Sequence, residues 1–137
     1  VASAFRFFEN QGMPGTIAAI TSVAGTRGIG EMPAYSASKR YQSNYIDALE
    51  QLAVSKGLDI SFCDIRPGWT RTPLLDPDRK YFMSMSERKV VISTVKALIR
   101  SRRVAVIDGR WRMLCAVWRR VPRCLWPHID FHSQEVR

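Results

Sequence analysis

A tyrosine and a lysine four residues apart, Tyr35 and Lys39, form the pair of side chains best suited to acid–base chemistry in this sequence. At that spacing they share one face of a helix. A tyrosine ordinarily releases its proton only at about pH 10, but a nearby ammonium group favours the phenolate. Such a phenol can exchange a proton with a substrate at neutral pH. An ordinary surface pair has the same spacing, so this pattern by itself is weak evidence.

Two further groups stand at the ends of apolar runs. Ser22 follows the run TIAAIT, and Pro67 and Gly68 follow the run DISFCDIR, with Thr70 and Thr72 close behind. A serine hydroxyl can stabilise an oxygen that gains negative charge, and glycine lets the backbone approach a ligand closely. The simpler alternatives are that the serine caps a loop and that the Pro-Gly pair only ends a strand.

Alternating strands and helices are predicted to position these groups. In chain order, the predicted elements are a helix tail at 1–11, a buried strand at 16–21, a helix at 34–56, a strand at 59–66, a helix at 86–99 and a buried strand at 104–108. Strands that alternate with helices of this length indicate a parallel sheet with right-handed crossovers. Ligands of such sheets bind beyond the carboxyl ends of the strands, where the serine and the Pro-Gly pair both stand.

The runs ITSVAG, PAYSASK and DIRPGWTRTP together resemble the C-terminal half of the short-chain dehydrogenase/reductase family, over about residues 1–110. The resemblance implies an α/β fold, the C-terminal half of a Rossmann-like doubly wound parallel sheet with three parallel strands and flanking helices. It implies an NAD(P)-dependent oxidoreductase that interconverts an alcohol and a ketone or aldehyde by hydride transfer. The alternative is a non-catalytic Rossmann-like binding or regulatory protein that has kept the motifs.

The resemblance also assigns roles to individual residues. Tyr35 would be the general acid or base, Ser22 would donate a hydrogen bond to the substrate oxygen, and Lys39 would hold the ribose hydroxyls of the nicotinamide nucleotide. Contacts with NAD or NADP are expected at Tyr35, Lys39, Pro67, Gly68, Thr70 and Thr72, and contacts with a small carbonyl or alcohol substrate at Ser22 and Tyr35. The family usually has valine or isoleucine at the position of Thr70.

Self-association is a further implication of the resemblance. Related dehydrogenases pair through the helix that corresponds to residues 34–56, so a homodimer or homotetramer is expected. Tyr41, Tyr45, Leu49 and Leu52 would supply the apolar area for this contact.

The loop GTRGIG at residues 25–30 looks like a dinucleotide fingerprint but does not meet its requirements. A phosphate-binding loop opens directly into a helix, whereas Pro33 intervenes here. No acidic residue ends a second strand about twenty residues later. We interpret the loop as a flexible substrate loop. The family's own glycine-rich turn lies in its N-terminal half, so the chain is expected to be a fragment that binds the dinucleotide poorly.

Positive charge is concentrated near the C-terminus. The chain has a formal charge of +9, and eight arginines against one aspartate between residues 100 and 123 supply seven of those charges. We divide the chain into a partial dehydrogenase domain at 1–109 and a basic aromatic tail at 110–137, in which Pro122 breaks the helix. The tail is interpreted as a lid or packing helix, with weak contact between residues 110–126 and an anionic membrane surface as the alternative. Nucleic acid is the least favoured partner.

Cysteine and histidine positions bear on compartment and metal binding. Three cysteines without a CxxC spacing are interpreted as reduced thiols: Cys63, Cys115 and Cys124. They favour a cytoplasmic location, with peripheral contact at the inner face of a membrane as the alternative for the tail. His128 and His132 flank Asp130, but no further ligand cluster accompanies them, so no metal site is predicted.

Overall fold

Three parallel strands form the central sheet in the order β1-β2-β5. They are β1 (Gly15–Ile20), β2 (Ile60–Arg66) and β5 (Val104–Val106). Ile17 lies opposite Phe62, and Ile65 lies opposite Ala105. The structure is a computed structural model that describes residues 1–73, 75–76 and 78–129. It confirms the predicted α/β fold with parallel strands.

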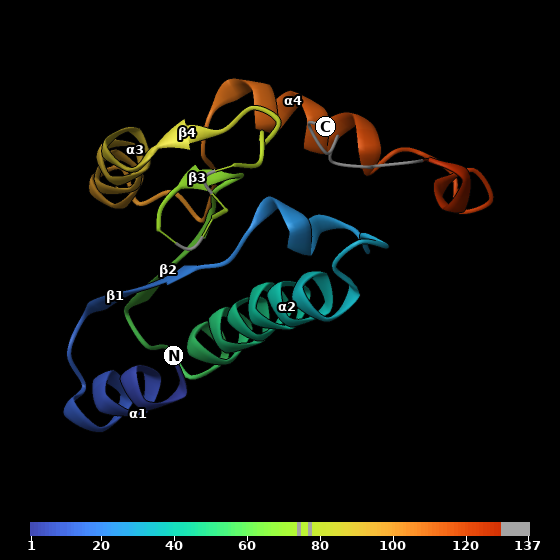
Figure 1. The fold of residues 1–137 in the computed structure, drawn as a ribbon. Coiled ribbons are helices and arrows are strands. Elements are labelled where there is room, and N and C mark those ends of the chain that lie inside the picture. Colours follow the sequence, from blue (N-terminus) through green and yellow to red (C-terminus); the bar gives the residue numbers. More distant parts are fainter. Residues whose placement is uncertain (74, 77, 130–137) are drawn as a thin grey trace.

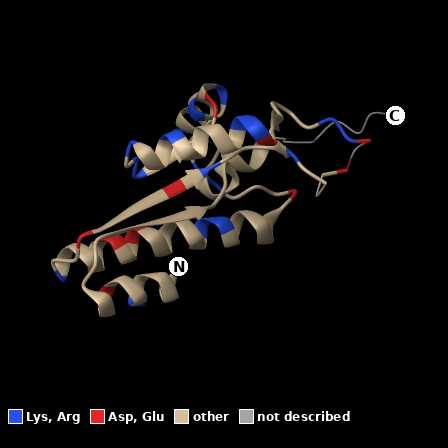
Figure 2. Ribbon diagram, turned by 90° about the vertical axis from the view of Figure 1, so that its left-hand side faces the viewer, with Lys and Arg blue, Asp and Glu red and all other residues tan. Residues whose placement is uncertain are grey.

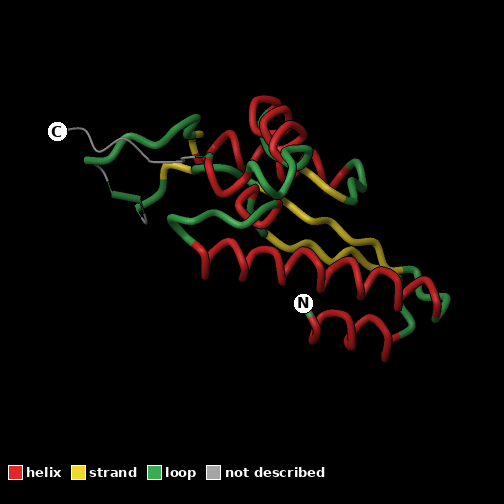
Figure 3. The backbone as a smooth tube through the Cα atoms, turned by 90° about the vertical axis from the view of Figure 1, so that its right-hand side faces the viewer, coloured by secondary structure: helices red, strands yellow, loops and turns green. Residues whose placement is uncertain are grey.

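Helices cover both faces of this sheet (Figures 1 and 3). Below it in Figure 1 lie α1 (Ala2–Gln11) and α2 (Pro33–Ser55), and above it lie α3 (Glu87–Ile99) and α4 (Gly109–Trp118). The crossover helices α2 and α3 each connect two neighbouring parallel strands.

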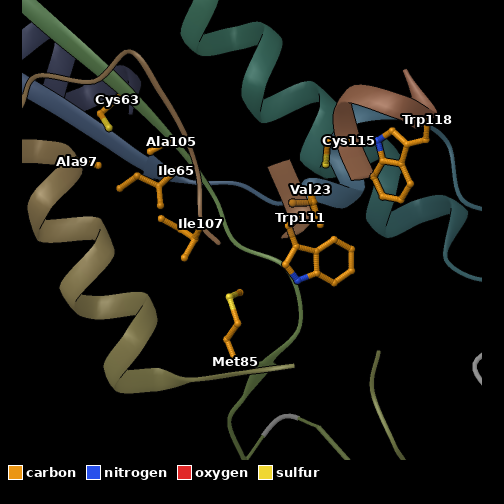
Figure 4. Packing of buried hydrophobic residues seen from close by; sticks show 10 residues of the cluster. All are labelled: Val23, Cys63, Ile65, Met85, Ala97, Ala105, Ile107, Trp111, Cys115 and Trp118. Atoms are coloured by element: carbon orange, nitrogen blue, oxygen red, sulfur yellow. The ribbon is translucent and has the colours of Figure 1, made fainter. Parts of the chain in front are cut away.

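Successive side chains of β2 enter two separate cores, because neighbouring residues of a strand point to opposite faces. The lower core contains Phe62 with Phe5, Ile17, Ile46, Leu49, Ala53 and Ile60. The upper core contains Cys63 and Ile65 with Val23, Met85, Ala97, Ala105, Ile107, Trp111, Cys115 and Trp118. Figure 4 shows the side chains of the upper core between the sheet, α3 and α4. The first part of the basic tail therefore shares a core with the sheet.

Turn residues set the ends of the helices close to their predicted positions. Gly12 (φ 60°) and Gly57 (φ 64°) follow α1 and α2 in the left-handed conformation that glycine adopts without strain. Pro33 stands in the first turn of α2, and Ser86 caps α3 by accepting a hydrogen bond from the Lys89 backbone. Beyond α4 the chain passes Pro122 before the short η2 (Trp126–His128), so the tail is divided as expected.

Two of the strands predicted to be buried are half exposed. Ile20 at the end of β1 is 64% exposed, and Val104 at the start of β5 is 39% exposed. Within the described residues, both strands are edges of the three-stranded sheet, and β2 alone has a neighbouring strand on each side. The prediction of buried strands was therefore wrong for β1 and β5, because an apolar run does not reveal how many neighbours its strand has.

The segment between β2 and α3 contains a feature that the sequence did not predict. Two short strands, β3 (Thr70–Arg71) and β4 (Met85–Ser86), pair in parallel and close this segment into a loop. A one-turn helix, η1 (Val23–Thr26), likewise follows β1 where only a loop was expected.

Candidate active site

Ser22 is fixed between the ends of β1 and β2. Its hydroxyl accepts a hydrogen bond from the Ala24 backbone (3.1 Å), which caps η1, and donates to the carbonyl oxygen of Pro67 (3.4 Å). The same carbonyl accepts a hydrogen bond from the Val23 backbone (3.0 Å). Ser22 thus caps a turn, as its simpler interpretation held, and it also lies beside Pro67 where the two strands end.

Tyr35 and Lys39 lie in the first turns of α2, on one face. The Lys39 ammonium is 5.7 Å from the centre of the Tyr35 ring and donates a hydrogen bond to the carbonyl oxygen of Ile20 (3.3 Å). Tyr35 is 46% exposed, so its phenol is accessible to a ligand. An ammonium group has three N–H donors, and this bond uses one of them. Lys39 therefore joins the start of α2 to the carboxyl end of β1 and keeps donors for a ligand.

Gly25 holds the turn after Ser22 against α2. A Cβ atom on Gly25 would stand 2.8 Å from the backbone carbonyl carbon of Lys39, closer than real Cβ contacts. Only glycine allows this approach without a shift of the backbone. The turn that carries Ser22 and the helix that carries Tyr35 are consequently fixed to each other at this point.

A buried polar network, which the sequence reasoning missed, fastens the two strand ends together. The Thr21 hydroxyl donates to Asp64 (2.5 Å), and the Arg66 guanidinium donates to the other carboxylate oxygen of Asp64 (2.6 and 2.8 Å). Asp64 is 1% exposed. Charged residues in the otherwise apolar run DISFCDIR were the available signal, because a buried charge requires a partner. The network joins the residue before Ser22 to the residue before Pro67.

Gly68 is covered by an indole ring. A Cβ atom on Gly68 would stand 2.2 Å from the Trp111 side chain of α4, and the Trp111 indole nitrogen donates to the Met83 carbonyl (3.2 Å). The close approach that the resemblance assigned to a nicotinamide ring is made here by Trp111. Thr70 donates to the Gly68 carbonyl (3.2 Å), and the hydroxyl of Thr72 has no hydrogen bond among the described residues.

The tail packs on the glycine loop at residues 25–30. The Trp118 indole donates to the Thr26 hydroxyl (2.8 Å), and the Trp126 indole donates to the Gly28 carbonyl (2.8 Å). Arg27 donates in return to the carbonyl oxygens of Trp118 (2.7 Å) and Val121 (2.6 Å). The packing interpretation of the tail is thus favoured, and the loop is anchored rather than free.

The buried thiols near this region are poor nucleophiles. Burial raises the pKa of Cys115, which packs beside Trp111 in the upper core. Burial and then the Asp64 charge raise the pKa of Cys63. Neither thiol is therefore a candidate for nucleophilic catalysis.

The described part of the chain contains neither a cluster of metal-ligating side chains nor a helix able to cross a membrane. Within it no three histidine, cysteine, aspartate or glutamate side chains gather as a metal site would require. Asp130 and His132, considered with His128 in the sequence, lie outside the described residues. Among the described helices, none combines the length and the apolar character needed to cross a bilayer.

One family model and several solved structures match this chain. Residues 1–81 match the model of the short chain dehydrogenase family. A short chain dehydrogenase from Burkholderia cenocepacia, solved with NADP, is similar at TM-score 0.73 and 14% identity, covering 93% of this chain and 54% of that one. A short chain dehydrogenase/reductase from Burkholderia phymatum, solved with NAD, is similar at TM-score 0.65 and 16% identity, covering 84% of this chain and 52% of that one.

A third solved structure is similar in the same way. It is the bulky-bulky ketone specific alcohol dehydrogenase from Comamonas testosteroni, at TM-score 0.59 and 23% identity, with 98% of this chain and 51% of that one covered. The chain thus spans about half the length of the solved structures that it matches. The likeness shows a Rossmann-like α/β fold over the part that is shared.

Proposed function

We propose, on the premise that this chain belongs to the short-chain dehydrogenase family, that the protein is an NAD(P)-dependent oxidoreductase. Its substrates would be an alcohol and the corresponding ketone or aldehyde. The observation that carries this proposal is that Lys39, 5.7 Å from the centre of the Tyr35 ring, is bonded to the carboxyl end of β1, which Ser22 follows. Related structures solved with NADP and with NAD support the choice of cofactor.

In the reduction direction, Tyr35 gives its phenolic proton to the carbonyl oxygen of the substrate as that oxygen gains negative charge. Ser22 stabilises the same oxygen by turning its hydroxyl from the Pro67 carbonyl, 3.4 Å away, toward the substrate. The Lys39 ammonium, 5.7 Å from the centre of the Tyr35 ring, supplies a positive charge beside the site of proton transfer. When bound, NADH or NADPH would supply the hydride for the carbonyl carbon. In the oxidation direction, Tyr35 accepts the proton of the alcohol.

The donors present fit one side of a nicotinamide nucleotide. The two N–H groups of Lys39 that Ile20 does not use would hold the ribose hydroxyls, and the free hydroxyl of Thr72 would bind the carboxamide. Gly68 fits less well, because Trp111 occupies the space next to it. We therefore assign Lys39 and Thr72 as the main cofactor contacts, with Pro67, Gly68 and Thr70 as backbone neighbours.

We further propose that residues beyond this chain complete the pyrophosphate and adenine side of the site. The matched structures are about twice as long as the chain. Apolar side chains on the open edge and on the outer face of α3 are exposed, as expected for surfaces that a further layer would cover: Ile20, Val91, Ile92, Val95 and Ile99.

A Tyr35→Phe variant of the complete natural protein tests the catalytic proposal. Phenylalanine keeps the ring but has no proton to transfer, so kcat with a panel of small ketones should fall by about 10²–10⁴-fold. Binding of NADH and NADPH, followed by their fluorescence, should stay near that of the natural protein. Tyr41→Phe is the matched control, because Tyr41 is an exposed tyrosine of the same helix. Near-normal turnover in Tyr35→Phe would reject the acid–base role.

The alternative, a non-catalytic binding or regulatory protein, is favoured by one observation. Trp111 lies against Gly68, where the resemblance expects the nicotinamide ring. In that case the fluorescence titration would show no nucleotide binding.

Two further proposals concern location and partners: a cytoplasmic protein that pairs with a second copy through α2, and peripheral membrane contact of the tail. The second is weakened, because Trp111 and Trp118 are 4% and 5% exposed and unavailable to lipid.

A further inference from the structure

A cleft of about 920 Å³ opens between the glycine loop at residues 25–30, the first turns of α2 and the tail. None of the proposed catalytic residues lines it. On α2 its wall includes Ala37 and Arg40, which are turned by about 140–200° from Tyr35 at about 100° per residue. The cleft is therefore separate from the residues proposed for hydride transfer, and the glycine loop, which the sequence suggested as a substrate loop, forms one of its walls.

The walls of the cleft are basic. Four arginines line it: Arg27, Arg40, Arg119 and Arg123. Arg27 is occupied, because it donates to the Trp118 and Val121 carbonyl oxygens and lies over the Trp126 ring at 4.3 Å. The other three form no ion pair with a carboxylate in the described part of the chain, and no described acidic residue lines the cleft. Figure 2 shows basic positions along α2 and in the layer above the sheet.

These positive charges favour an anionic ligand in the cleft. Like charges around one cavity repel, and an anion placed between them reverses the sign of that interaction. Guanidinium groups bind phosphate through paired hydrogen bonds, which makes arginine the usual residue for that group. The N–H groups of Gly28 and Gly30 add two donors that have no acceptor among the described residues. A Cβ atom at either glycine would meet nothing within 4 Å, so the space beside them is open.

Most of the other side chains that line the cleft are apolar, with Thr26 and Ser36 as polar exceptions. Trp126, Pro127 and Ile129 stand on the tail side of the cleft, and Ile29 and Pro33 stand on the side of the loop and α2. A ligand for this cleft therefore has an anionic end and an apolar body.

We propose that the cleft binds an organic phosphate with an apolar body. Arg40, Arg119 and Arg123 hold the phosphate group, and the apolar body lies against Trp126 and Ile129. A soluble metabolite and the headgroup of an anionic lipid share this chemistry. The proposal does not depend on the proposed oxidoreductase activity, because Ser22, Tyr35 and Lys39 do not line the cleft.

Calorimetry with octyl phosphate tests this proposal in the complete natural protein, at concentrations below micelle formation. Octyl phosphate should bind at least tenfold more tightly than inorganic phosphate, which lacks the apolar body, and than octyl glucoside, which lacks the anion. Tryptophan fluorescence should change on binding, because Trp126 lines the cleft. Equal affinity for octyl glucoside and octyl phosphate would overturn the anionic site.

Charge-removing variants locate the binding. Arg119→Gln combined with Arg123→Gln, and separately Arg40→Gln, should each weaken octyl phosphate binding at least tenfold. The matched control is Arg100→Gln with Arg102→Gln, which removes the same charge from a second basic cleft of about 450 Å³ near β5 and should change the affinity less than twofold. An equal loss in this control, or no loss in Arg40→Gln, would overturn the assignment. If circular dichroism shows that the tail variant is unfolded, Arg40→Gln, which lies on α2, still tests whether this cleft binds octyl phosphate.

Vesicles identify the source of the phosphate. Phosphatidic acid in phosphatidylcholine vesicles should bind the protein with the same dependence on Arg40, Arg119 and Arg123 if a lipid headgroup enters the cleft. Octyl phosphate binding with that dependence, and no vesicle binding, would assign the cleft to a soluble organic phosphate. Both results support the site, whereas vesicle binding that all the variants retain equally, without octyl phosphate binding, would contradict it.

Discussion

Asp108 joins two helices of the upper layer through one carboxylate. It caps α4 by accepting a hydrogen bond from the Arg110 backbone (3.0 Å), and it also accepts from the side chains of Arg110 (2.8 Å) and Lys89 (2.6 Å). Its φ of 77° with a ψ of 131° is a positive-φ conformation outside the left-handed helical region, and residues other than glycine adopt it rarely. The hydrogen bond from the Arg110 side chain, and then the one from Lys89, hold the pKa of Asp108 well below its usual range.

Because of Asp108, we predict that part of the free energy of unfolding is lost in acid. A carboxyl group whose pKa is lower in the folded state stabilises the fold above its unfolded pKa, and that contribution is lost as the pH falls below about 4. Asp108→Asn keeps a cap but loses the charge, so its free energy of unfolding should be about 1 kcal/mol lower at neutral pH. Urea unfolding at several pH values measures both quantities. The two proteins should converge in acid, and a constant difference down to pH 2 would contradict the assignment.

At the scale of elements, the docking of α4 on the end of β2 is the contact that shapes the site. Trp111 is 4% exposed and fills the space beside Gly68, while the carbonyl of Met83 holds its indole nitrogen. The same helix brings Cys115 and Trp118 into the upper core. The segment after Pro67 is thus held between the sheet and α4.

Gly68→Ala is predicted to disturb this contact. The new methyl group would stand 2.2 Å from the Trp111 ring, so the ring or the backbone must move, at a cost of about 1–3 kcal/mol in the free energy of unfolding. Gly109→Ala is the matched control, because a Cβ atom there meets nothing within 4 Å. Thermal unfolding of both variants should show a lower midpoint for Gly68→Ala alone. Equal midpoints would show that the Trp111 contact is not tight in solution.

At the scale of the whole molecule, α2 faces the core with one side and solvent with the other. Ile46, Leu49 and Ala53 pack into the lower core, whereas Tyr41 is 67% exposed and Leu52 is 39% exposed. Leu49 is therefore not available for self-association, which corrects that part of the expectation. Tyr41 stacks on Tyr45 at 5.8 Å, so an outward apolar stripe runs through Tyr41, Tyr45, Ala48 and Leu52.

We predict that two copies of the complete protein pair through this stripe. A two-fold interface brings the same helix from each copy together and buries the exposed aromatic and aliphatic groups. Tyr41→Asp with Leu52→Asp should raise the dissociation constant of the dimer at least tenfold in sedimentation experiments. Val54→Asp is the control, because Val54 is 75% exposed but lies off the stripe. Only monomer at micromolar concentration in the natural protein would count against this interface.

The sequence by itself determined the order and type of the main elements. Local signals carried this information: Pro33 at the start of α2, Gly57 after it, and apolar runs of strand length at β1 and β2. The spacing of Tyr35 and Lys39 also placed both residues on one face of a helix, because that geometry is a property of the helix alone.

Only the tertiary structure decided which strands have neighbours and which side chains meet across the chain. The apolar run around Ile20 predicts a core residue. In the structure Ile20 is exposed at the edge of the sheet, because exposure depends on what lies beside the strand. The contacts of Trp111 with Gly68 and of Arg27 with Val121 join residues 43 and 94 positions apart, and no local pattern encodes them. The same long-range packing turned the glycine loop from an expected free loop into one wall of a basic cleft, because the tail that completes the cleft is distant in sequence.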